Sequence, residues 1–176
     1  MAEAFLRVDL AARGVSIPVG SAGFVTEGAP PPPEVVRVMA DAGIDIAAHR
    51  SRRLGTQLMR DAALVVTMTG QHLVEVTAGY PEASGKSFTF AEVLDRGGRT
   101  GPRLAREPVG EWVGRVHSSQ RPASPFPLSA GRDVADPMGG PLRGYEQVRD
   151  ILAAMTARLA AILDPAGRPP RPAGPA

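Results

Sequence analysis

The 176-residue sequence contains 20 basic and 18 acidic residues, a single lysine, Lys86, and no cysteine. The lack of cysteine excludes disulfides, thiolate metal sites and cysteine nucleophiles from these 176 residues. No apolar run approaches the roughly 18 to 20 residues of a membrane span, no basic run alternates with aromatic residues, and no secretion signal is recognisable, so we expect a cytoplasmic protein that binds neither membrane nor nucleic acid.

Two helices and a strand are predicted in the first quarter of the chain. Apolar residues at helical spacing predict a helix over 1–13, and Gly14 follows where a left-handed C-cap is expected. Residues 16–24 have the composition of a short strand, which Pro18 confines to a sheet edge because proline lacks a backbone donor. The segment 34–44 has the apolar face of a second helix.

The middle of the chain alternates strand and helix patterns. A cationic connector at 44–54 and a short helix precede a continuous apolar, β-branched run at 62–68, the pattern of a strand covered on both faces. A helix beginning at Gln71 and a weaker strand at 85–90 follow. This alternation predicts the α/β class, with a parallel sheet and helices on both faces.

The last third of the chain begins with an irregular segment. Pro and Gly are dense at both ends of 96–130, which predicts a long surface excursion with a helix near 108–117. A final helix then carries an apolar stripe from Leu142 to Ile162. We therefore expect one domain over 1–163 and a disordered Pro/Gly-rich tail over 164–176.

Six sequence pieces have a recognisable order and spacing. They are MAEAFLR in the first helix, SAG at 21–23, the G-x-P turn at 28–30, GIDIAAHRSR at 43–52, ALVVTM at 63–68, and DVADPMGG at 133–140 with Tyr145 after it. In the order and spacing of these pieces the chain resembles the low-molecular-weight phosphotyrosine protein phosphatases over roughly residues 1–95 and 131–163.

The resemblance implies a three-layer fold around a four-stranded parallel sheet in the order 2-1-3-4. In the family, the first strand runs into a phosphate-binding loop C-x5-R-S-P, which runs into the helix that begins M-A-E-A. We therefore expect the central first strand and this loop to be missing from the 176 residues and to be encoded before Met1. A gene start assigned to an internal methionine would produce such a truncation.

The resemblance also implies the chemistry of a phosphomonoester hydrolase. A family member uses a Cys thiolate as nucleophile, an Arg that clamps the phosphoryl oxygens, and an Asp that protonates the leaving group and then activates water. Asp136, in DVADP, matches this general acid; a plain Asp-Pro-Gly-Gly turn is the alternative. The chain as written lacks the nucleophile and is expected to be inactive, and no cofactor or metal is implied.

The remaining matched positions have supporting roles by resemblance, each with an ordinary structural alternative. Ser21 would bond to the phosphate loop or to strand-end backbone. His49 and Arg52 would support the loop or line its rim, or belong to a solvated cationic connector. Asp133 would be the family's second acidic residue or a helix cap. Tyr145 would lie near the leaving-group pocket, although its place on the last helix's stripe favours core packing.

The sequence leaves the substrate and the oligomeric state open. With the loop restored, the substrate would be a phosphorylated protein or a small phosphoester, and phosphotyrosine is not separable from phosphoarginine. The alternative is a non-catalytic pseudophosphatase that acts as a binding or regulatory module. An unrelated nucleotide-binding domain is disfavoured because the sequence has no G-x-G-x-x-G or Walker loop.

The truncation hypothesis predicts the coding sequence before Met1. Translation in the same frame should give an apolar strand followed by C-x5-R-S-P, because the matched helix directly follows that loop in the family. Sequencing the genomic DNA upstream of Met1 checks this. A stop codon directly before Met1 would contradict it and favour the pseudophosphatase.

Overall fold

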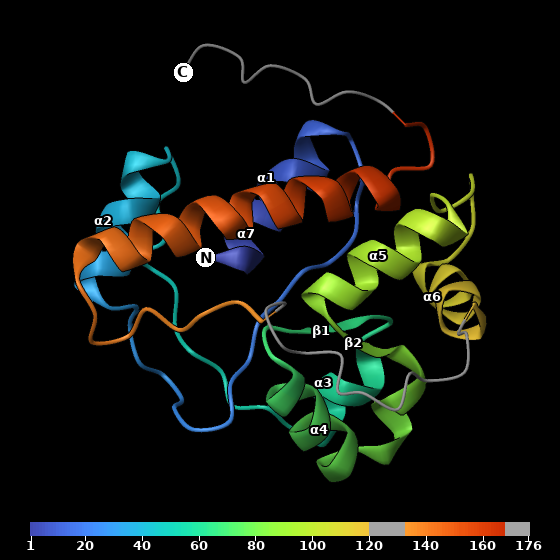
Figure 1. Cartoon of the computed structure of the whole chain (residues 1–176), viewed down its shortest axis with the longest axis horizontal. Coiled ribbons are helices and arrows are strands. Elements are labelled where there is room, and N and C mark those ends of the chain that lie inside the picture. Colours follow the sequence, from blue (N-terminus) through green and yellow to red (C-terminus); the bar gives the residue numbers. More distant parts are fainter. Residues whose placement is uncertain (120–132, 168–176) are drawn as a thin grey trace. The chain divides into compact units, whose positions relative to one another are not determined.

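The computed structural model describes residues 1–119 and 133–167. Figure 1 colours the chain along its sequence and labels its helices and strands. Within the two described ranges, none of the helices combines the length and apolar character needed to cross a membrane.

The described residues divide into two compact units, and each is considered by itself. The first comprises Met1–Leu54 and Ala135–Ala160; the second comprises the described parts of Gly55–Val134 and Ala161–Gly167. A single domain over 1–163 stays a prediction.

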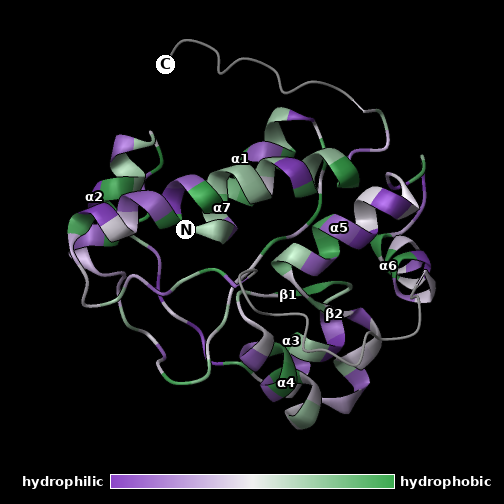
Figure 2. Cartoon of the chain, viewed as in Figure 1, coloured by the Kyte–Doolittle hydropathy of each residue, from purple (hydrophilic) through white to green (hydrophobic). Residues whose placement is uncertain are grey.

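Three helices form the first unit, and all three follow the predicted spacing. They are α1 (Ala2–Ala12), α2 (Pro33–Asp41) and most of α7 (Leu142–Leu163). Gly14 has a φ of 66° and its N–H donates to Ala11 O, so the residue that ends the α1 turn is left-handed as predicted. Figure 2 shows polar and apolar residues alternating along α7, as expected for a helix with one buried stripe.

The core of the first unit comes from the apolar faces of these helices. Complete burial of one Val, Leu, Phe or Met side chain stabilises a fold by about 1.5–3 kcal/mol relative to leaving it exposed. The buried residues are Phe5, Leu10, Val38, Met39, Tyr145, Val148, Leu152, Leu159 and Ala160.

A polar contact links α1 to α7 inside this unit. Burial raises the pKa of the Asp9 carboxyl on α1, while the Thr156 hydroxyl on α7 and the charge of Arg13 oppose that rise. Thr156 is fully buried. The two helices therefore bring polar side chains together inside this unit.

The predicted strand at 16–24 is wrong: only Gly23 makes a β-type contact there, an isolated parallel bridge to Arg53. The reason lies in the carbonyls of this segment. Val19 O accepts two hydrogen bonds from the Arg7 guanidinium, and Ser21 O accepts one from Arg52. Side chains thus occupy carbonyls that a strand ladder would use.

Backbone hydrogen bonds form after the predicted strand begins, between residues 23–29 and residues 51–54 at the end of the connector. The Gly23 N–H donates to Arg52 O at 2.9 Å, and the Leu54 N–H donates to Gly23 O at 2.8 Å. The Ser51 N–H donates to Ala29 O at 2.9 Å. These bonds hold the connector in an extended course beside 23–29.

The second unit contains two short parallel strands and most of the remaining helices. The strand at 62–68 and the strand at 85–90 exist but are shorter than predicted. The elements are α3 (Thr56–Asp61), β1 (Val65–Thr67), α4 (Gly70–Gly79), the 3-10 helix η1 (Pro81–Lys86), β2 (Ser87–Thr89), α5 (Phe90–Thr100) and α6 (Val109–Ser118).

The strands β1 and β2 pair directly and in parallel, with Val66 opposite Phe88. Both strands are largely buried. The α/β class and the parallel sheet are therefore confirmed. Direct pairing of these two strands also agrees with their places as neighbours, third and fourth, in the order 2-1-3-4.

The helix α5 corrects the prediction of an irregular excursion from 96 onward. The Thr89 hydroxyl accepts the Glu92 N–H, and Glu92 Oε2 accepts the Thr89 N–H, so a capping box starts this helix. It continues through Gly97 and Gly98 to Thr100. The helix predicted near 108–117 is confirmed as α6.

The loop between α5 and α6 is fixed by an ion pair. Arg115 Nε lies 2.7 Å from Glu107 Oε1, and Arg115 Nη2 lies 2.9 Å from Glu107 Oε2. This two-point contact lowers the pKa of the Glu107 carboxyl, because the guanidinium stabilises its charged form. Of the excursion predicted over 96–130, the structure describes residues 96–119, and residues 120–130 lie outside the described residues.

The chain after α7 begins with a buried residue. Asp164 is fully buried and its Oδ1 accepts the Ala166 N–H at 2.9 Å. Residues 164–167 of the predicted disordered tail are among the described residues, and 168–176 lie outside them, so the disordered tail stays a prediction.

Two neighbouring glycines of α5 give a matched test of packing in the second unit. A Cβ added at Gly97 would lie 2.9 Å from Trp112 Cζ2, whereas one added at Gly98 meets nothing within 4 Å. We expect Gly97→Ala to lower the free energy of unfolding by about 1–3 kcal/mol through overpacking. Gly98→Ala should raise it by about 0.5–1 kcal/mol through helix propensity.

Urea unfolding of the two variants measures both effects. Equal changes in the free energy of unfolding would show that Gly97 does not lie against Trp112.

Candidate functional site

The loop around Asp136 is held by hydrogen bonds of its own. Asp136 is exposed, and its Oδ1 accepts the Met138 N–H at 3.0 Å. The Gly140 N–H donates to Pro137 O at 2.9 Å, and Gly139 adopts a left-handed φ of 76°. The other carboxylate oxygen, Oδ2, has no hydrogen-bond partner among the described residues. Such a carboxyl has a fixed backbone and one oxygen open to an incoming group.

Tyr145 contacts this loop from α7. Its side chain is 3% exposed, and its hydroxyl accepts the Gly139 N–H at 3.2 Å. The ring therefore packs in the core of the first unit while the hydroxyl bonds to the Asp136 loop. The burial of Tyr145 agrees with the core packing that the helix stripe favours. Its place near a leaving-group pocket stays a prediction.

Asp133 caps a helix in the second unit. Its Oδ1 accepts the N–H of Gly70, the first residue of α4, at 3.0 Å. The next residue, Val134, donates its N–H to Met68 O at 2.9 Å, just after β1. A carboxylate at a helix N-terminus accepts a free backbone donor and opposes the positive end of the helix dipole.

Ser21, His49 and Arg52 lie around the first turn of α1. The Ser21 hydroxyl donates to Glu3 Oε2, and His49 Nδ1 lies 4.0 Å from the same oxygen. Arg52 Nε donates to Ser21 O at 3.2 Å. The three residues come from two loop segments more than 25 positions apart in the sequence, and Glu3 joins them.

Glu3 is the residue that the sequence did not single out. Its carboxylate is 12% exposed and also pairs with Arg7, Nη2 to Oε1 at 2.6 Å. Arg7 in turn donates to Val19 O at 2.7 Å. An acid in the first turn of a helix with a cation four positions later is a recognisable pattern, but it is common in ordinary helices.

The contacts thus form two groups in the first unit. One group joins Asp136, Gly139 and Tyr145, and the other is arranged around Glu3. No hydrogen bond or ion pair between described residues connects the two groups. In residues 1–119 and 133–167, no three His, Cys, Asp or Glu side chains are arranged to hold a metal ion.

A protein-family model matches the first part of the chain. The model for "Low molecular weight phosphotyrosine protein phosphatase" matches residues 1–100, which contain the Glu3 group. The loop at 133–140 lies beyond the matched range.

Individual relatives bear similar names. A probable low molecular weight protein-tyrosine-phosphatase, EpsP of Ralstonia solanacearum, is 38% identical over 93 residues, which are 53% of this chain and 62% of that protein. The chain thus spans about three fifths of the length of this relative. A protein-arginine-phosphatase of Geobacillus stearothermophilus is 30% identical over 145 residues, 82% of this chain and 75% of that protein.

A solved structure is similar over most of the chain. The low molecular weight protein tyrosine phosphatase of T. tengcongensis superposes with a TM-score of 0.67 at 27% sequence identity. The match covers 90% of this chain and 86% of that one.

The Glu3 group predicts an unequal cost for two acidic substitutions. Glu3→Ala removes a nearly buried carboxylate that accepts from Ser21 and pairs with Arg7, so it should lower the free energy of unfolding by about 1.5–3 kcal/mol. Asp95→Ala removes an exposed partner of Arg99 at the same i,i+4 spacing and should cost at most about 1 kcal/mol.

Urea unfolding monitored by circular dichroism compares the two variants. A cost for Glu3→Ala no larger than that for Asp95→Ala would contradict the assigned role of Glu3.

Proposed function

Because the chain belongs to the low molecular weight phosphotyrosine protein phosphatase family, we propose that it carries the acid part of a phosphomonoester hydrolase site, with Asp136 as the general acid. The observation that supports this most is the loop itself. The exposed Asp136 is fixed through Oδ1 by the Met138 N–H and keeps Oδ2 open, in a DVADPMGG sequence that matches the family's acid loop.

The proposed reaction has two steps. In the first, a Cys thiolate attacks phosphorus and the bond between phosphorus and the leaving oxygen breaks, while Asp136 gives its proton to that oxygen. In the second, Asp136 takes a proton from water as the water attacks the cysteinyl phosphate. Inorganic phosphate leaves, the thiolate is restored, and Asp136 is protonated again.

The nucleophile is outside the 176 residues. These residues contain no cysteine, so they do not form a cysteinyl phosphate on their own. We propose that a strand and a C-x5-R-S-P loop supply the thiolate and the phosphate-binding Arg. The chain without that segment is then inactive as a hydrolase.

Supporting roles follow for the matched residues. Ser21 and His49, both at the Glu3 carboxylate, would hold the loop segments beside the start of α1. Asp133 would fix the start of α4, and Tyr145 would fix the Asp136 loop through Gly139. Each of them positions other groups in this proposal and transfers no proton.

The substrate class is a phosphorylated protein or a small phosphoester. Among the relatives, EpsP is named as a probable tyrosine phosphatase and the Geobacillus protein as an arginine phosphatase. The proposal covers both, because the general acid can protonate either the phenolate oxygen of phosphotyrosine or, as the bond between phosphorus and nitrogen breaks, the bridging nitrogen of phosphoarginine.

A second candidate function has one observation in its favour. A chain that holds the family's fold and acid loop but no cysteine fits a non-catalytic binding or regulatory module. Such a module would bind phosphorylated or acidic partners without turnover.

The test uses residues 1–176 alone and a fusion in which a family strand and C-x5-R-S-P loop precede Met1. We expect no hydrolysis of p-nitrophenyl phosphate above background by residues 1–176, and measurable turnover by the fusion. In the fusion, Asp136→Asn should lower kcat by roughly 10²- to 10⁴-fold with a modest change in KM, as loss of acid catalysis implies.

Asp133→Asn in the fusion is the matched control, because it changes an acid three positions away that caps α4. Its effect on kcat should be much smaller. Turnover by residues 1–176 that Asp136→Asn abolishes would contradict the need for an external thiolate. A fusion that folds but does not turn over would favour the non-catalytic module.

A further inference from the structure

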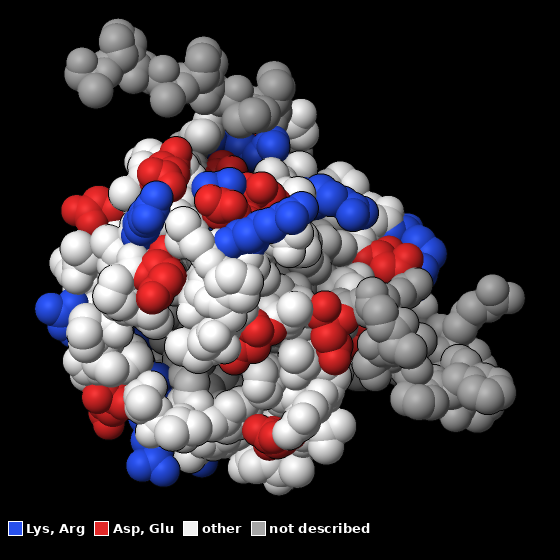
Figure 3. Space-filling model, turned by 60° about the vertical axis from the view of Figure 1, so that its left-hand side comes forward, with Lys and Arg blue, Asp and Glu red and all other residues white. Residues whose placement is uncertain are grey.

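Three exposed arginines follow one another closely on the connector at 44–54. Arg50, Arg52 and Arg53 are all exposed, and no described carboxylate lies within ion-pair distance of them. Figure 3 shows basic and acidic side chains interspersed on the face that it draws. The connector therefore concentrates positive charge that the described part of the chain does not neutralise.

The guanidinium of Arg52 is held in place by its surroundings. Its Nε donates to Ser21 O at 3.2 Å, and its Nη2 lies directly against the backbone of Gly20. A Cβ at position 20 would collide with Nη2. Gly20 thus leaves the space in which this guanidinium lies, and the remaining N–H groups of Arg52 are left for another acceptor.

Arg50 is fixed in a similar way. Its Nη1 donates to Ala47 O at 3.0 Å and to His49 O at 2.7 Å. Arg50 and Arg52 are two positions apart in the sequence. Side chains on one face of an extended peptide also come from every second residue, about 6.6 Å apart, so each arginine can meet one of two such side chains.

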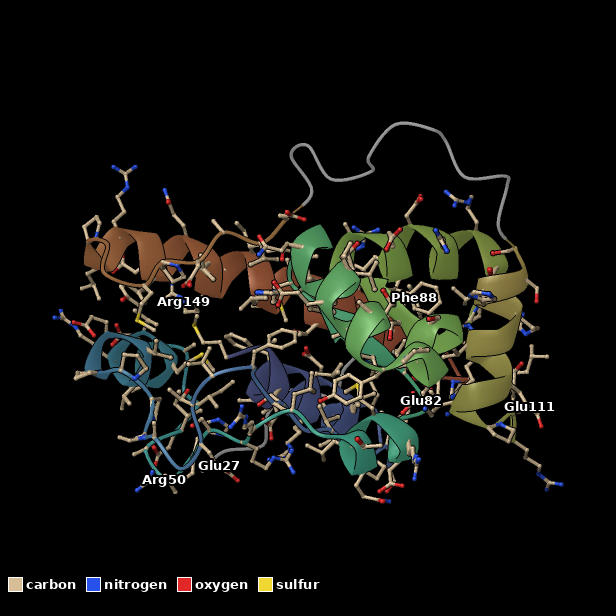
Figure 4. All side chains as sticks on the ribbon, turned by 90° about the horizontal axis from the view of Figure 1, so that it is seen from below. Glu27, Arg50, Glu82, Phe88, Glu111 and Arg149 are labelled. Carbon is tan, nitrogen blue, oxygen red and sulfur yellow. The ribbon has the colours of Figure 1, made fainter. Side chains whose placement is uncertain are left out.

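The nearby acids do not cancel this charge. In the paired segment 23–29 the acidic residue is Glu27, which is exposed. Figure 4 shows Arg50 and Glu27 on two loop segments at the lower left of the view. Asp45 Oδ1 already accepts the Ala47 N–H at 2.8 Å. In the described part of the chain, neither Glu27 nor Asp45 forms an ion pair with any of the three arginines.

From these contacts we propose that Arg50 and Arg52 form a preorganised surface that binds acidic side chains of an extended partner peptide, with the neighbouring Arg53 adding to its positive charge. The inference rests on the proposed function, in which that peptide flanks the phosphorylated residue of a protein substrate. Guanidinium groups already held by backbone carbonyls lose little side-chain entropy on binding carboxylates, which favours them over freely rotating lysines.

Separate arginines along an extended segment fit separate carboxylates better than one phosphate group. The guanidinium of Arg52 is held by Ser21 O and lies in the space that Gly20 leaves, so its position should be the most sensitive to substitution.

The test measures binding to residues 1–176 by fluorescence anisotropy at low ionic strength. The probe is a labelled peptide with Glu at alternate positions, and its comparison is the same peptide with Gln in place of Glu. The wild-type chain should bind the Glu peptide at least tenfold more tightly than the Gln peptide, and added salt should weaken that binding.

Gly20→Ala keeps every charge but should displace the Arg52 guanidinium, so affinity for the Glu peptide should fall about fivefold or more. Gly23→Ala is the matched control, because a Cβ there meets nothing within 4 Å; its affinity should stay within twofold of wild type. Arg52→Gln should weaken binding at least as much as Gly20→Ala, and Arg52→Lys should restore less than half of the loss.

Equal affinities of the Gly20→Ala and Gly23→Ala chains would overturn the proposal, as would equal binding of the Glu and Gln peptides. Displacement of the peptide by millimolar inorganic phosphate, but not by chloride of the same ionic strength, would assign the surface to free phosphate and also overturn it. Melting temperatures of both glycine variants exclude unfolding as the cause. Because no turnover is measured, peptide binding and the hydrolase activity succeed or fail separately.

Discussion

The first unit depends on one nearly buried carboxylate. Glu3 lies in the first turn of α1, where a negative charge is favoured by the helix dipole, and its two oxygens take partners from α1 itself and from a distant loop. A charge with 12% exposure is costly unless it is paired, so Ser21 and Arg7 are held where they can reach it. Through Arg7 the same carboxylate fixes Val19, and through Ser21 it fixes the segment on which Arg52 lies. The start of α1 and the segments around residues 20 and 50 are therefore arranged as one group.

In the family, a phosphate-binding loop precedes the helix that corresponds to α1. In this chain the contacts of Glu3 with Ser21 and Arg7 fix the segments around the start of that helix. In the same unit, the loop of Asp136 is shaped by its own backbone and by the Tyr145 hydroxyl. In this loop one carboxylate oxygen of Asp136 accepts the Met138 N–H and the other has no partner among the described residues, which suits the proton transfer proposed for it. The second unit contributes the parallel pair β1 and β2 and the cap that Asp133 places on α4.

Residue spacing predicted α1, α2 and α7 because each helix has one apolar face, and Gly14 and Gly43 marked the ends of α1 and α2. It failed at 16–24, where the carbonyls of Val19 and Ser21 bond to arginine side chains from other segments, a long-range effect that no local pattern reveals. It also failed at α5, where Gly97 and Gly98 have the composition of a loop, although Gly97 serves the close approach of Trp112. Asp136 could be selected only through its resemblance to the family, since Asp-Pro-Gly-Gly alone is an ordinary turn. Glu3 was missed because an acid in a first helical turn is too common to stand out.

The central claim is that Asp136 protonates the leaving group, and the dependence of rate on the leaving group tests it most directly. The measurement compares kcat/KM for phenyl phosphate and for p-nitrophenyl phosphate, in the fusion that carries the C-x5-R-S-P loop and in its Asp136→Asn form. Phenolate is the poorer leaving group and needs the proton more, so the substitution should reduce kcat/KM for phenyl phosphate far more than for p-nitrophenyl phosphate. Equal reductions for the two substrates would contradict the claim.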